Sequence, residues 1–345
     1  MFEPTIKDVA KMCGVGVSTV SRAINDHPDI NPETKERIMD AIRESGYVPN
    51  DSARNLKRVD AKAIAVLVKG IANPFFTSMI TVIEQECKKR HYSMELSHIE
   101  ADEDEVDVAQ KVVKEKRLRG IIFLGGLFSH SEEKLKKLTV PFVFSTAGSV
   151  PEHISRKQYS SISVDDRRES LKMVDYLIRS GHTRIAILVA EAMEESVGRL
   201  LLEGYCDALR AHGIEVDPGL ICQTEDGLSH FSMENGYRST KRLLQCGGQF
   251  TALYAVSDAL AIGALRALYE AGLRVPQDIS LAGYDGIDMT DYTVPSLTTI
   301  RQPVEEMAKD TTRLLFDIIA KKTKHQHITY EAELLVREST AKIPE

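Results

Sequence analysis

The sequence predicts two parts of different fold class: an N-terminal all-α helix-turn-helix domain, and a larger α/β core of two Rossmann-like lobes. The first observation is that residues 5–45 contain three short segments whose apolar residues recur every three or four positions, as on one helix face. The second is that short apolar runs alternate with amphipathic segments from residue 61 onward, in two successive series. A chain of 345 residues is long enough for two or three domains.

The first helix is predicted to begin after Thr5. Thr5 is a favourable N-cap residue, and Asp8 stands three positions later, as a capping box requires. Gly14 can adopt the positive φ that ends a helix and reverses the chain. One apolar face of this helix is formed by Ile6, Val9, Ala10 and Cys13.

A second helix is predicted over Val17–Ile24, with Gly16 as its N-cap and a buried face made by Val20, Ala23 and Ile24. A helix of this kind can lie in the DNA major groove and present side chains to base edges. On pattern alone, an ordinary helical hairpin with a solvated second helix is an equally good interpretation. The exposed face would offer Val17, Ser18, Thr19, Ser21 and Arg22.

A third helix is predicted over Asn31–Ser45, with Asn31 as N-cap, Pro32 at the first helical position and Gly46 beyond its end. Together with the stretch after it, this N-terminal part resembles the DNA-binding domain of the lactose-repressor/galactose-repressor (LacI/GalR) family of bacterial transcription regulators. The matching stretches, in order and at the family's spacing up to about residue 58, are T-I-K-D-V-A, V-S-T-V-S-R-A-I-N, G-Y-V-P-N and A-R-N-L-K.

The resemblance implies a sequence-specific transcription regulator, expected to be a repressor, that binds pseudo-palindromic double-stranded operator DNA as a homodimer. The regulated genes are expected to serve carbohydrate-related metabolism. The residues that the resemblance places on DNA are Thr5, Val17, Ser18, Thr19, Ser21, Arg22, Asn25, Asn50, Ala53, Arg54, Leu56 and Lys57.

Residues 50–60 are expected to link a head, residues 1–49, to the core, residues 61–340. The segment is too short to be a stable isolated helix in water. By resemblance it is the family's hinge helix, which folds on the operator and enters the minor groove. Leu56 would then wedge between central base pairs, with Arg54 and Lys57 against phosphates. Without the resemblance, a solvated linker is the simpler interpretation.

The net charge does not by itself indicate DNA binding. The whole chain carries −7, and residues 1–60 contain nine Lys/Arg against ten Asp/Glu. A basic domain would be expected of a protein that neutralises phosphates. Positive charge is instead concentrated at Arg54, Lys57, Arg58 and Lys62. We therefore expect specific binding by a dimer and modest affinity for random DNA.

Composition favours a protein of the cytoplasm without membrane association. No run of 18 apolar residues occurs, and the first residues, M-F-E-P-T, lack the features of a signal peptide. The five cysteines are widely spaced and form no C-x-x-C pair, which is typical of reduced thiols.

The core is expected to contain parallel sheets covered on both faces, because apolar strands alternate with amphipathic helices. Ligands of such sheets bind beyond the carboxyl ends of the strands, so two facing lobes should enclose a cleft. The strand-like runs are 63–68, 93–99, 120–126, 141–146, 160–165, 184–190, 216–224, 252–258 and 279–285, and the tail adds 297–303, a helix over 304–322 and a strand over 327–339. The remaining helices are expected over 77–90, 103–116, 131–138, 168–180, 200–212, 236–245 and 262–271.

By resemblance, the core is similar to periplasmic sugar-binding proteins, with crossovers between lobes near residues 161, 292 and 326. These crossovers would give an N-lobe of about 61–161 plus 293–325 and a C-lobe of about 162–291 plus 326–340. No leucine heptads follow the core, which favours a dimer over a tetramer.

Candidate effector-binding residues follow strands. Asp285, in A-G-Y-D, matches the family's acidic ligand-binding residue, which accepts hydrogen bonds from hydroxyls. Of Phe75 and Phe76, one is expected to cap the core and the other to stack on a ligand. Asp258 is more simply a helix cap. The full set is Phe75, Phe76, Thr146, Asp165, Arg199, Phe231, Ser257 and Asp285.

Two positions depart from the family. Leu201 stands where members that bind sugars or purines usually carry Arg, and Thr146 where an acidic residue or Asn is common. Arg199 lies ~200° around the helix from Leu201 and is no simple substitute. The effector is therefore a sugar or derivative that is less polar or held differently, or a protein corepressor acts instead. The segment F-L-G-G…K-L-K-K…V-P-F-V resembles the catabolite-control branch, whose corepressor is a phosphorylated phosphocarrier protein.

An α/β enzyme or a solute-binding protein with a helical appendage is the alternative outside this class. The sequence contains no G-x-S-x-G, H-E-x-x-H or Walker A motif. His325 and His327 share one face of a predicted strand, but no third ligand accompanies them. We therefore predict no catalytic, metal or cofactor site.

Overall fold

The computed structural model describes residues 4–24, 27–47, 62–100, 102–126, 131–147, 154–190 and 196–343. The chain divides into two compact units, a head of Met1–Ala61 and a core of Lys62–Glu345. Six predicted DNA-binding residues lie outside the described residues: Asn25, Asn50, Ala53, Arg54, Leu56 and Lys57.

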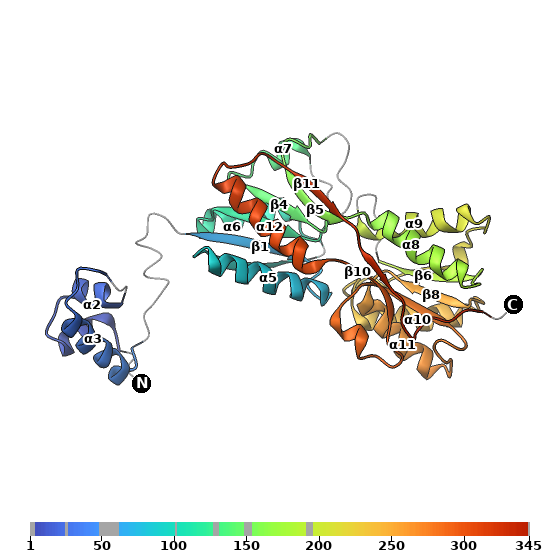
Figure 1. Cartoon of the computed structure of the whole chain (residues 1–345), viewed down its shortest axis with the longest axis horizontal. Helices are drawn as coiled ribbons and strands as arrows, with labels where there is room; N and C mark the ends of the chain where they lie inside the picture. The colour runs from blue at the N-terminus through green and yellow to red at the C-terminus, as the bar shows by residue number, and fades with distance from the viewer. Residues whose placement is uncertain are drawn as a thin grey trace. The chain divides into compact units, whose positions relative to one another are not determined.

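The described residues of the head form three helices, α1 (Ile6–Met12), α2 (Val17–Ile24) and α3 (Pro32–Ser45), which confirm the predicted helix-turn-helix arrangement (Figure 1). Local sequence explains their ends. Gly14 turns the chain with φ 62°, and Gly46 ends α3 with φ 67°. The Asn31 side chain caps α3 by accepting the Glu33 N–H at 2.9 Å. The buried core of the head is formed by Val9, Ala10, Val20, Ala23, Ile38 and Ala41.

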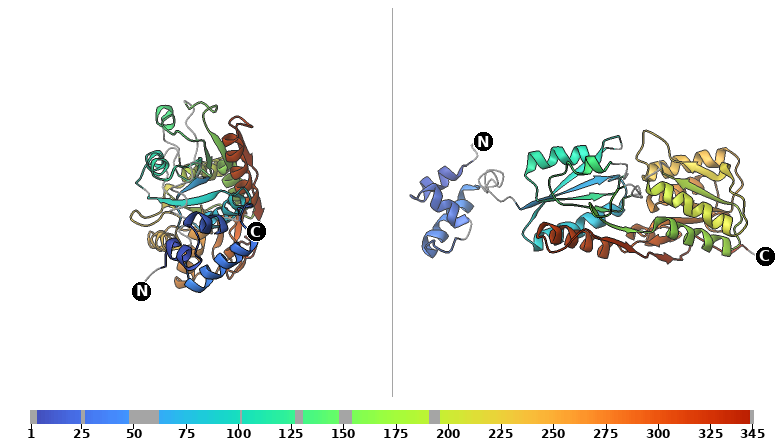
Figure 2. Two further views of the ribbon diagram at one scale, coloured as in Figure 1. Left: turned by 90° about the vertical axis from the view of Figure 1, so that its left-hand side faces the viewer. Right: turned by 90° about the horizontal axis from the view of Figure 1, so that it is seen from above.

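The N-lobe is a parallel six-stranded sheet in the order β11-β5-β4-β3-β1-β2. Helices α5 and α12 cover one face of this sheet and α6 covers the other (Figure 1; Figure 2). Alternate residues of β1 belong to these two layers: Ile64 and Val66 lie in the buried cluster with α5 and α12, whereas Ala65 and Leu67 cluster with α6. The elements are β1 (Ala63–Lys69), α5 (Phe75–Lys89), β2 (Ser93–Ile99), α6 (Glu105–Lys116), β3 (Gly120–Leu124), α7 (Glu132–Leu135), β4 (Phe142–Ser145), β5 (Ser160–Val164), α12 (Val304–Ile319) and β11 (His327–Tyr330).

The C-lobe is a second six-stranded sheet, β12-β10-β9-β8-β6-β7, in which only the β10–β12 pair among the described strands is antiparallel. Gly204 and Gly236 allow close helix pairing, since a side chain at either would collide with backbone of the neighbouring helix. The elements are α8 (Asp166–Arg179), β6 (Ile185–Val189), α9 (Val197–Ala211), η1 (Pro218–Leu220), β7 (Ile221–Gln223), α10 (Met233–Gln245), β8 (Ala252–Ala255), α11 (Asp258–Glu270), β9 (Ser280–Asp285), η2 (Asp288–Asp291), β10 (Thr298–Arg301) and β12 (Glu333–Leu335).

The chain passes between the lobes after β5, after β10 and after β11, which end three, nine and four residues beyond the predicted crossovers near 161, 292 and 326. The chain leaves each sheet only after the strand has completed its pairing. Val164 still pairs with Tyr330 in the N-lobe sheet, and Arg301 still pairs with Asp285 in the C-lobe sheet. The single strand predicted over 327–339 is corrected for the same reason. It is two strands in different sheets, because the chain crosses to the C-lobe between Tyr330 and Glu333.

Within the part of the chain that the structure describes, no helix combines the length and apolar character needed to cross a bilayer.

Candidate nucleic-acid interface and ligand cleft

The outer face of α2 is the candidate nucleic-acid interface of the head. Because Val20 and Ala23 point into the core of the head, the helical period turns Val17, Ser18 and Arg22 outward, where all three are exposed. Ser21 is exposed as well and Thr19 is half-buried. These five predicted residues therefore lie on or beside one accessible helix face.

Arg22 makes an ion pair within the head. Its Nη1 lies 3.2 Å from Asp29 Oδ2, and both side chains are more than half exposed. An exposed ion pair of this kind contributes little to stability. A stronger anionic acceptor, or a base edge, can therefore compete with Asp29 for the guanidinium.

Thr5 precedes α1 and confirms the predicted capping box. The Asp8 carboxylate accepts the Thr5 N–H at 2.8 Å and the Thr5 hydroxyl at 2.6 Å. Those hydrogen bonds from Thr5 hold the pKa of Asp8 below its usual range. The exposed N-terminus of α1 is thereby fixed, and contact of Thr5 with DNA stays a prediction.

The core contains a cavity of about 520 Å³ whose walls come from both lobes. This volume lies within the ~300–1,000 Å³ typical of small-molecule sites. As the fold predicts, the cavity lies at strand ends: β1, β3 and β4 of the N-lobe and β9 of the C-lobe. Five predicted effector residues line it, namely Phe75, Phe76, Thr146, Phe231 and Asp285.

Asp285 joins the two lobes at this cavity. Its Oδ2 accepts the Asn73 Nδ2 at 2.9 Å from the N-lobe, and its Oδ1 accepts the Gln302 Nε2 at 3.0 Å. Asn73 is oriented by its own Oδ1, which accepts the Phe75 N–H at 3.1 Å. Burial, and then the negative charge of Asp258, raises the pKa of Asp285 well above its usual range. Its backbone adopts φ 116°, a strained conformation for a residue other than glycine.

Asp166 is a second buried carboxylate on the cavity wall. It accepts the Tyr284 hydroxyl at 2.8 Å. Burial raises the pKa of Asp166 to about 7, although the hydrogen bond from Tyr284 opposes the shift. Asp166 and Asp285 therefore offer the cavity two carboxyl groups whose direct partners are uncharged.

Aromatic side chains form apolar parts of the wall. Phe75 and Phe76 are both buried, with ring centroids 5.4 Å apart in an edge-to-face arrangement. The Phe76 ring lies against Gly125, where an added Cβ would approach it to 2.8 Å. Phe231 is half-buried on the C-lobe side. Thr146, at φ 57°, accepts the Gly125 N–H at 3.2 Å and thus ties two strand ends together.

Three predicted effector residues are not brought to the cavity. The Asp165 carboxylate accepts the Arg168 N–H at 3.1 Å and caps α8. The Ser257 hydroxyl accepts the Leu260 N–H at 3.2 Å and caps α11, a role that the sequence suggested for Asp258. Arg199 points away on α9, where its Nε lies 2.9 Å from Glu203 Oε1.

Sequence reasoning missed Asn73, Asp166 and Gln302 as cavity residues. Asn73 and Gln302 each precede a proline, in A-N-P and R-Q-P, where the chain is extended or turning rather than helical. Asp166 directly follows the predicted residue Asp165. Asp165 caps α8, so it is Asp166 rather than Asp165 that lines the cavity.

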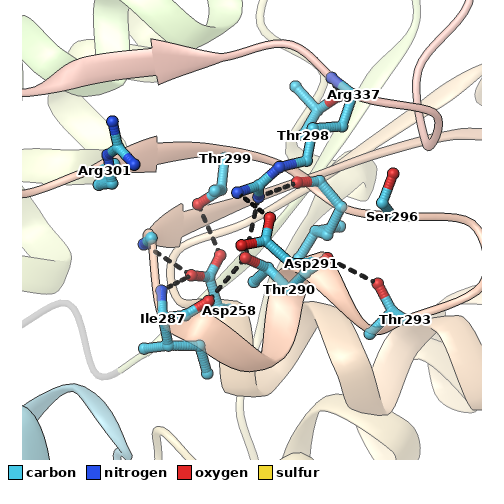
Figure 3. Close-up of polar contacts among 12 residues, drawn as sticks. Asp258, Ile287, Thr290, Asp291, Thr293, Ser296, Thr298, Thr299, Arg301 and Arg337 are labelled. Carbon is cyan, nitrogen blue, oxygen red and sulfur yellow. Dashed lines mark hydrogen bonds and ion pairs between the residues drawn. The ribbon is translucent and has the colours of Figure 1, made fainter.

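Asp258 is buried beneath the loop that follows Asp285. Its Oδ2 accepts the N–H groups of Gly286 at 2.7 Å and Ile287 at 2.9 Å, and its Oδ1 accepts the Thr299 hydroxyl at 2.6 Å (Figure 3). Burial raises the pKa of Asp258 to about 7. One carboxylate thus fixes the start of this loop to α11 and β10.

Arg337 fixes the rest of that loop, residues 286–297. Its Nη1 donates to the Thr290 hydroxyl at 2.9 Å and to the Leu297 carbonyl at 2.8 Å, and its guanidinium pairs with Asp291 (Figure 3). The loop is rigidly held, yet two apolar side chains stand out from it, Tyr292 at 84% exposed and Val294 at 90%.

His325 and His327 are held by protein partners. His325 Nδ1 lies 3.1 Å from the Ser160 hydroxyl, and His327 bridges the Ser161 hydroxyl and the Arg156 carbonyl at 2.8 Å each. Among the described residues, no group of three or more His, Cys, Asp or Glu is arranged to hold a metal ion.

Comparisons with known proteins agree with this two-part architecture. The description "Bacterial regulatory proteins, lacI family" matches residues 5–50, and "Periplasmic binding protein-like domain" matches residues 174–340. The HTH-type transcriptional regulator MalR of Clostridium butyricum is 38% identical over 336 residues, which cover 97% of this chain and 98% of the relative.

Two solved structures are similar over almost the whole chain. The transcriptional regulator CelR in complex with cellobiose has a TM-score of 0.71 at 29% identity, covering 98% of this chain and 100% of that one. The lac repressor dimer bound to operator and the anti-inducer ONPF has a TM-score of 0.74 at 26% identity, covering 99% and 100%.

Proposed function

This chain belongs to the lacI family of DNA-binding bacterial transcription regulators, and we propose that it is a repressor. Its operator affinity is set by a sugar-type effector in the cleft. Its relatives regulate transcription and are not enzymes. The observation that carries the proposal is the pair of hydrogen bonds by which Asp285 joins Asn73 and Gln302 in the cleft.

Base reading is assigned to α2. Val17 offers an apolar contact and Ser18 a hydroxyl. The Arg22 guanidinium can donate two hydrogen bonds to one guanine, to its O6 and N7 atoms. All three are exposed on one helix face, which supports the assignment. The hinge assignment, with Leu56 as a wedge in the minor groove, rests on the resemblance alone.

Effector binding is assigned to the groups around Asp285. A sugar hydroxyl can donate to the Asp285 carboxyl while the ring packs against an aromatic side chain such as Phe231. A ligand there contacts both lobes and changes the hydrogen bond between Asn73 and Asp285. It alters DNA affinity only if its own affinity differs between the DNA-competent and incompetent arrangements of the lobes.

A homodimer is supported by the 286–297 loop. Tyr292 and Val294 are exposed on a loop whose backbone is fixed by Asp258 and Arg337, so they form a preorganised apolar surface. Burial of that surface against a second copy would give a molecule with two heads, which a pseudo-palindromic operator with two half-sites requires. The lac repressor structure in the comparison is a dimer on operator DNA.

A protein corepressor is the weaker alternative. Two of the three lysines in the K-L-K-K part of the segment that resembles the catabolite-control branch are paired within the chain: Lys134 with Asp104 and Asp107, and Lys136 with Glu132. Cations already neutralised in this way offer little to a phosphorylated partner. We place the protein in the cytoplasm because a bacterial regulator of this family acts on DNA there.

The proposal is tested by selecting operators from a random DNA pool with the purified full-length protein. We expect enrichment of one pseudo-palindromic sequence with two half-sites. Recovery of DNA without a shared sequence would contradict the assignment of α2 as a base-reading helix.

A further inference from the structure

We propose that the cleft takes an uncharged sugar and excludes the phosphorylated form of the same sugar. The inference rests on the proposed function of the cleft as the effector site and specifies its ligand. It is carried by the distribution of charged groups over the cavity wall.

Most of the charged side chains on that wall are carboxyl groups. Asp166 and Asp285 lie at the buried end, where their direct partners are the uncharged donors Tyr284, Asn73 and Gln302. Three further carboxylates line the cavity from exposed positions, two on the N-lobe side and one on the C-lobe side: Glu100, Asp102 and Asp226. An anion that enters therefore meets negative charge at the entrance. At the buried end it meets two carboxyl groups that carry no positive charge in either protonation state.

Cations do not balance these carboxylates. Among the described residues that line the cavity, Lys69 is the only lysine and arginine is absent. Lys69 Nζ lies 3.3 Å from Glu105 Oε1 and donates to the Glu103 carbonyl at 2.9 Å, and both charged side chains of the pair are largely buried. The core residues that the structure leaves undescribed between positions 62 and 343 include no lysine or arginine.

The two histidines among the described lining residues offer little compensation for the negative charge. His98 Nδ1 faces the Glu100 carboxylate at 3.4 Å, and His230 Nδ1 lies 2.9 Å from the Thr224 hydroxyl. The positive charge of a protonated His98 would thus already be paired with the Glu100 carboxylate.

The N-terminus of α9 is a feature of the cavity that favours anions, but its effect is weaker than that of the carboxylates. Ser196, Val197 and Gly198, at the N-terminus of α9, line the cavity. A helix N-terminus carries about half a positive charge and can bind phosphate. Here the Ser196 hydroxyl already accepts the Arg199 N–H at 3.0 Å. Half a charge does not offset the carboxylates, and a phosphate buried without an arginine or lysine loses its hydration without replacement.

The volume indicates which uncharged sugars to use as probes. At ~30 Å³ per water in the liquid, 520 Å³ corresponds to about 17 waters. That is more than one pyranose ring displaces, so disaccharides are the appropriate probes. A regulator with this selectivity responds to a sugar that has not undergone phosphoryl transfer.

The test uses isothermal titration of the full-length protein with maltose and cellobiose, and with maltose 6′-phosphate and cellobiose 6′-phosphate. We expect at least one uncharged disaccharide to bind and its phosphorylated form to bind at least tenfold more weakly. Raising the ionic strength should reduce this ratio, because salt screens exposed charges.

A charge-neutralised variant, Glu100→Gln with Asp102→Asn and Asp226→Asn, should also reduce the ratio. A matched control removes three exposed acids that do not line the cavity, Glu234→Gln, Glu305→Gln and Glu333→Gln, and should leave the ratio unchanged. Equal or tighter binding of a phosphorylated disaccharide would overturn the inference and leave the effector site in place. Failure of all four probes to bind would overturn both.

Discussion

Asn73 and Asp285 are separated by 212 positions in the chain and are joined by a hydrogen bond of 2.9 Å in the cleft between the two lobes. Asn73 stands in the loop between β1 and α5 of the N-lobe, and Asp285 ends β9 of the C-lobe. The bond is therefore a direct contact between lobes that a ligand can replace. Its position makes it the point at which cleft occupancy can alter the arrangement of the lobes.

Replacement of Asn73 tests this contact. Asn73→Ala leaves the Asp285 Oδ2 without its amide donor and the Phe75 N–H without an acceptor. We expect the core to lose about 1–3 kcal/mol of unfolding free energy, as buried polar groups left unpaired typically cost. Urea unfolding measures the loss. Ser78→Ala on the exposed face of α5 is the control and should change stability by less than about 0.5 kcal/mol.

Arg22 tests base reading by α2. Arg22→Ala should weaken operator binding by about 1–3 kcal/mol and relax the preference at one base pair. Fluorescence anisotropy with operator and random duplexes measures both effects, with Arg179→Ala on the core as the control. Equal losses on operator and random DNA would make Arg22 a phosphate contact instead.

Leu56 tests the hinge assignment. Leu56→Ala should weaken operator binding, because a smaller side chain cannot hold a base step open. The dimer should persist, which sedimentation can verify. An operator affinity equal to that of the unaltered protein would rule out the wedge.

Val294 tests the proposed dimer surface. Val294→Asp places a charge on the 286–297 loop and should weaken self-association at least tenfold, since burying an unpaired carboxylate is costly. Sedimentation equilibrium of the full chain measures the effect. Leu171→Asp, on an exposed position of α8, serves as the control. A dimer of undiminished affinity would place the interface elsewhere.

Asp166 predicts a specific pH dependence of stability. Burial raises the pKa of Asp166 from 3.8 to about 7 in the folded protein. Below pH 4 the residue is protonated in both states, so folding has its full favourable contribution there. Between pH 4 and 7 the unfolded chain releases this proton while the folded chain keeps it. Stability is lost over that range, by at most roughly 4 kcal/mol.

Asp166→Asn removes this dependence and keeps an acceptor for the Tyr284 hydroxyl. The stability of the variant relative to the unaltered protein should therefore rise from pH 4 to pH 7. Urea unfolding at a series of pH values gives the difference. A difference that is constant with pH would show that Asp166 titrates normally.

Local chemistry explains why the head was predictable. The bounds of α2, the Asn31 cap and the positive φ of Gly14 and Gly46 depend on residues a few positions apart. Asp285 and Phe231 were predicted in the cleft through the family resemblance rather than through any local pattern. Both line the cavity.

The remaining cavity residues depend on tertiary structure, which no local sequence pattern indicates. Gln302 reaches Asp285 only because β10 pairs with β9 in register, and no local pattern indicates that pairing. Ser257 and Asp165 look like ligand groups at strand ends, yet each caps the helix that follows. A strand end that begins a helix presents two polar residues in succession, and sequence alone does not tell which one caps the helix.

The most direct measurement is the operator affinity of the full-length protein with and without a saturating disaccharide that titration has shown to bind. The operator affinity should change by at least fivefold, and Asn73→Ala should reduce this response while operator binding persists. An operator affinity that stays the same when the cleft is filled would contradict the claim that the cleft controls DNA binding.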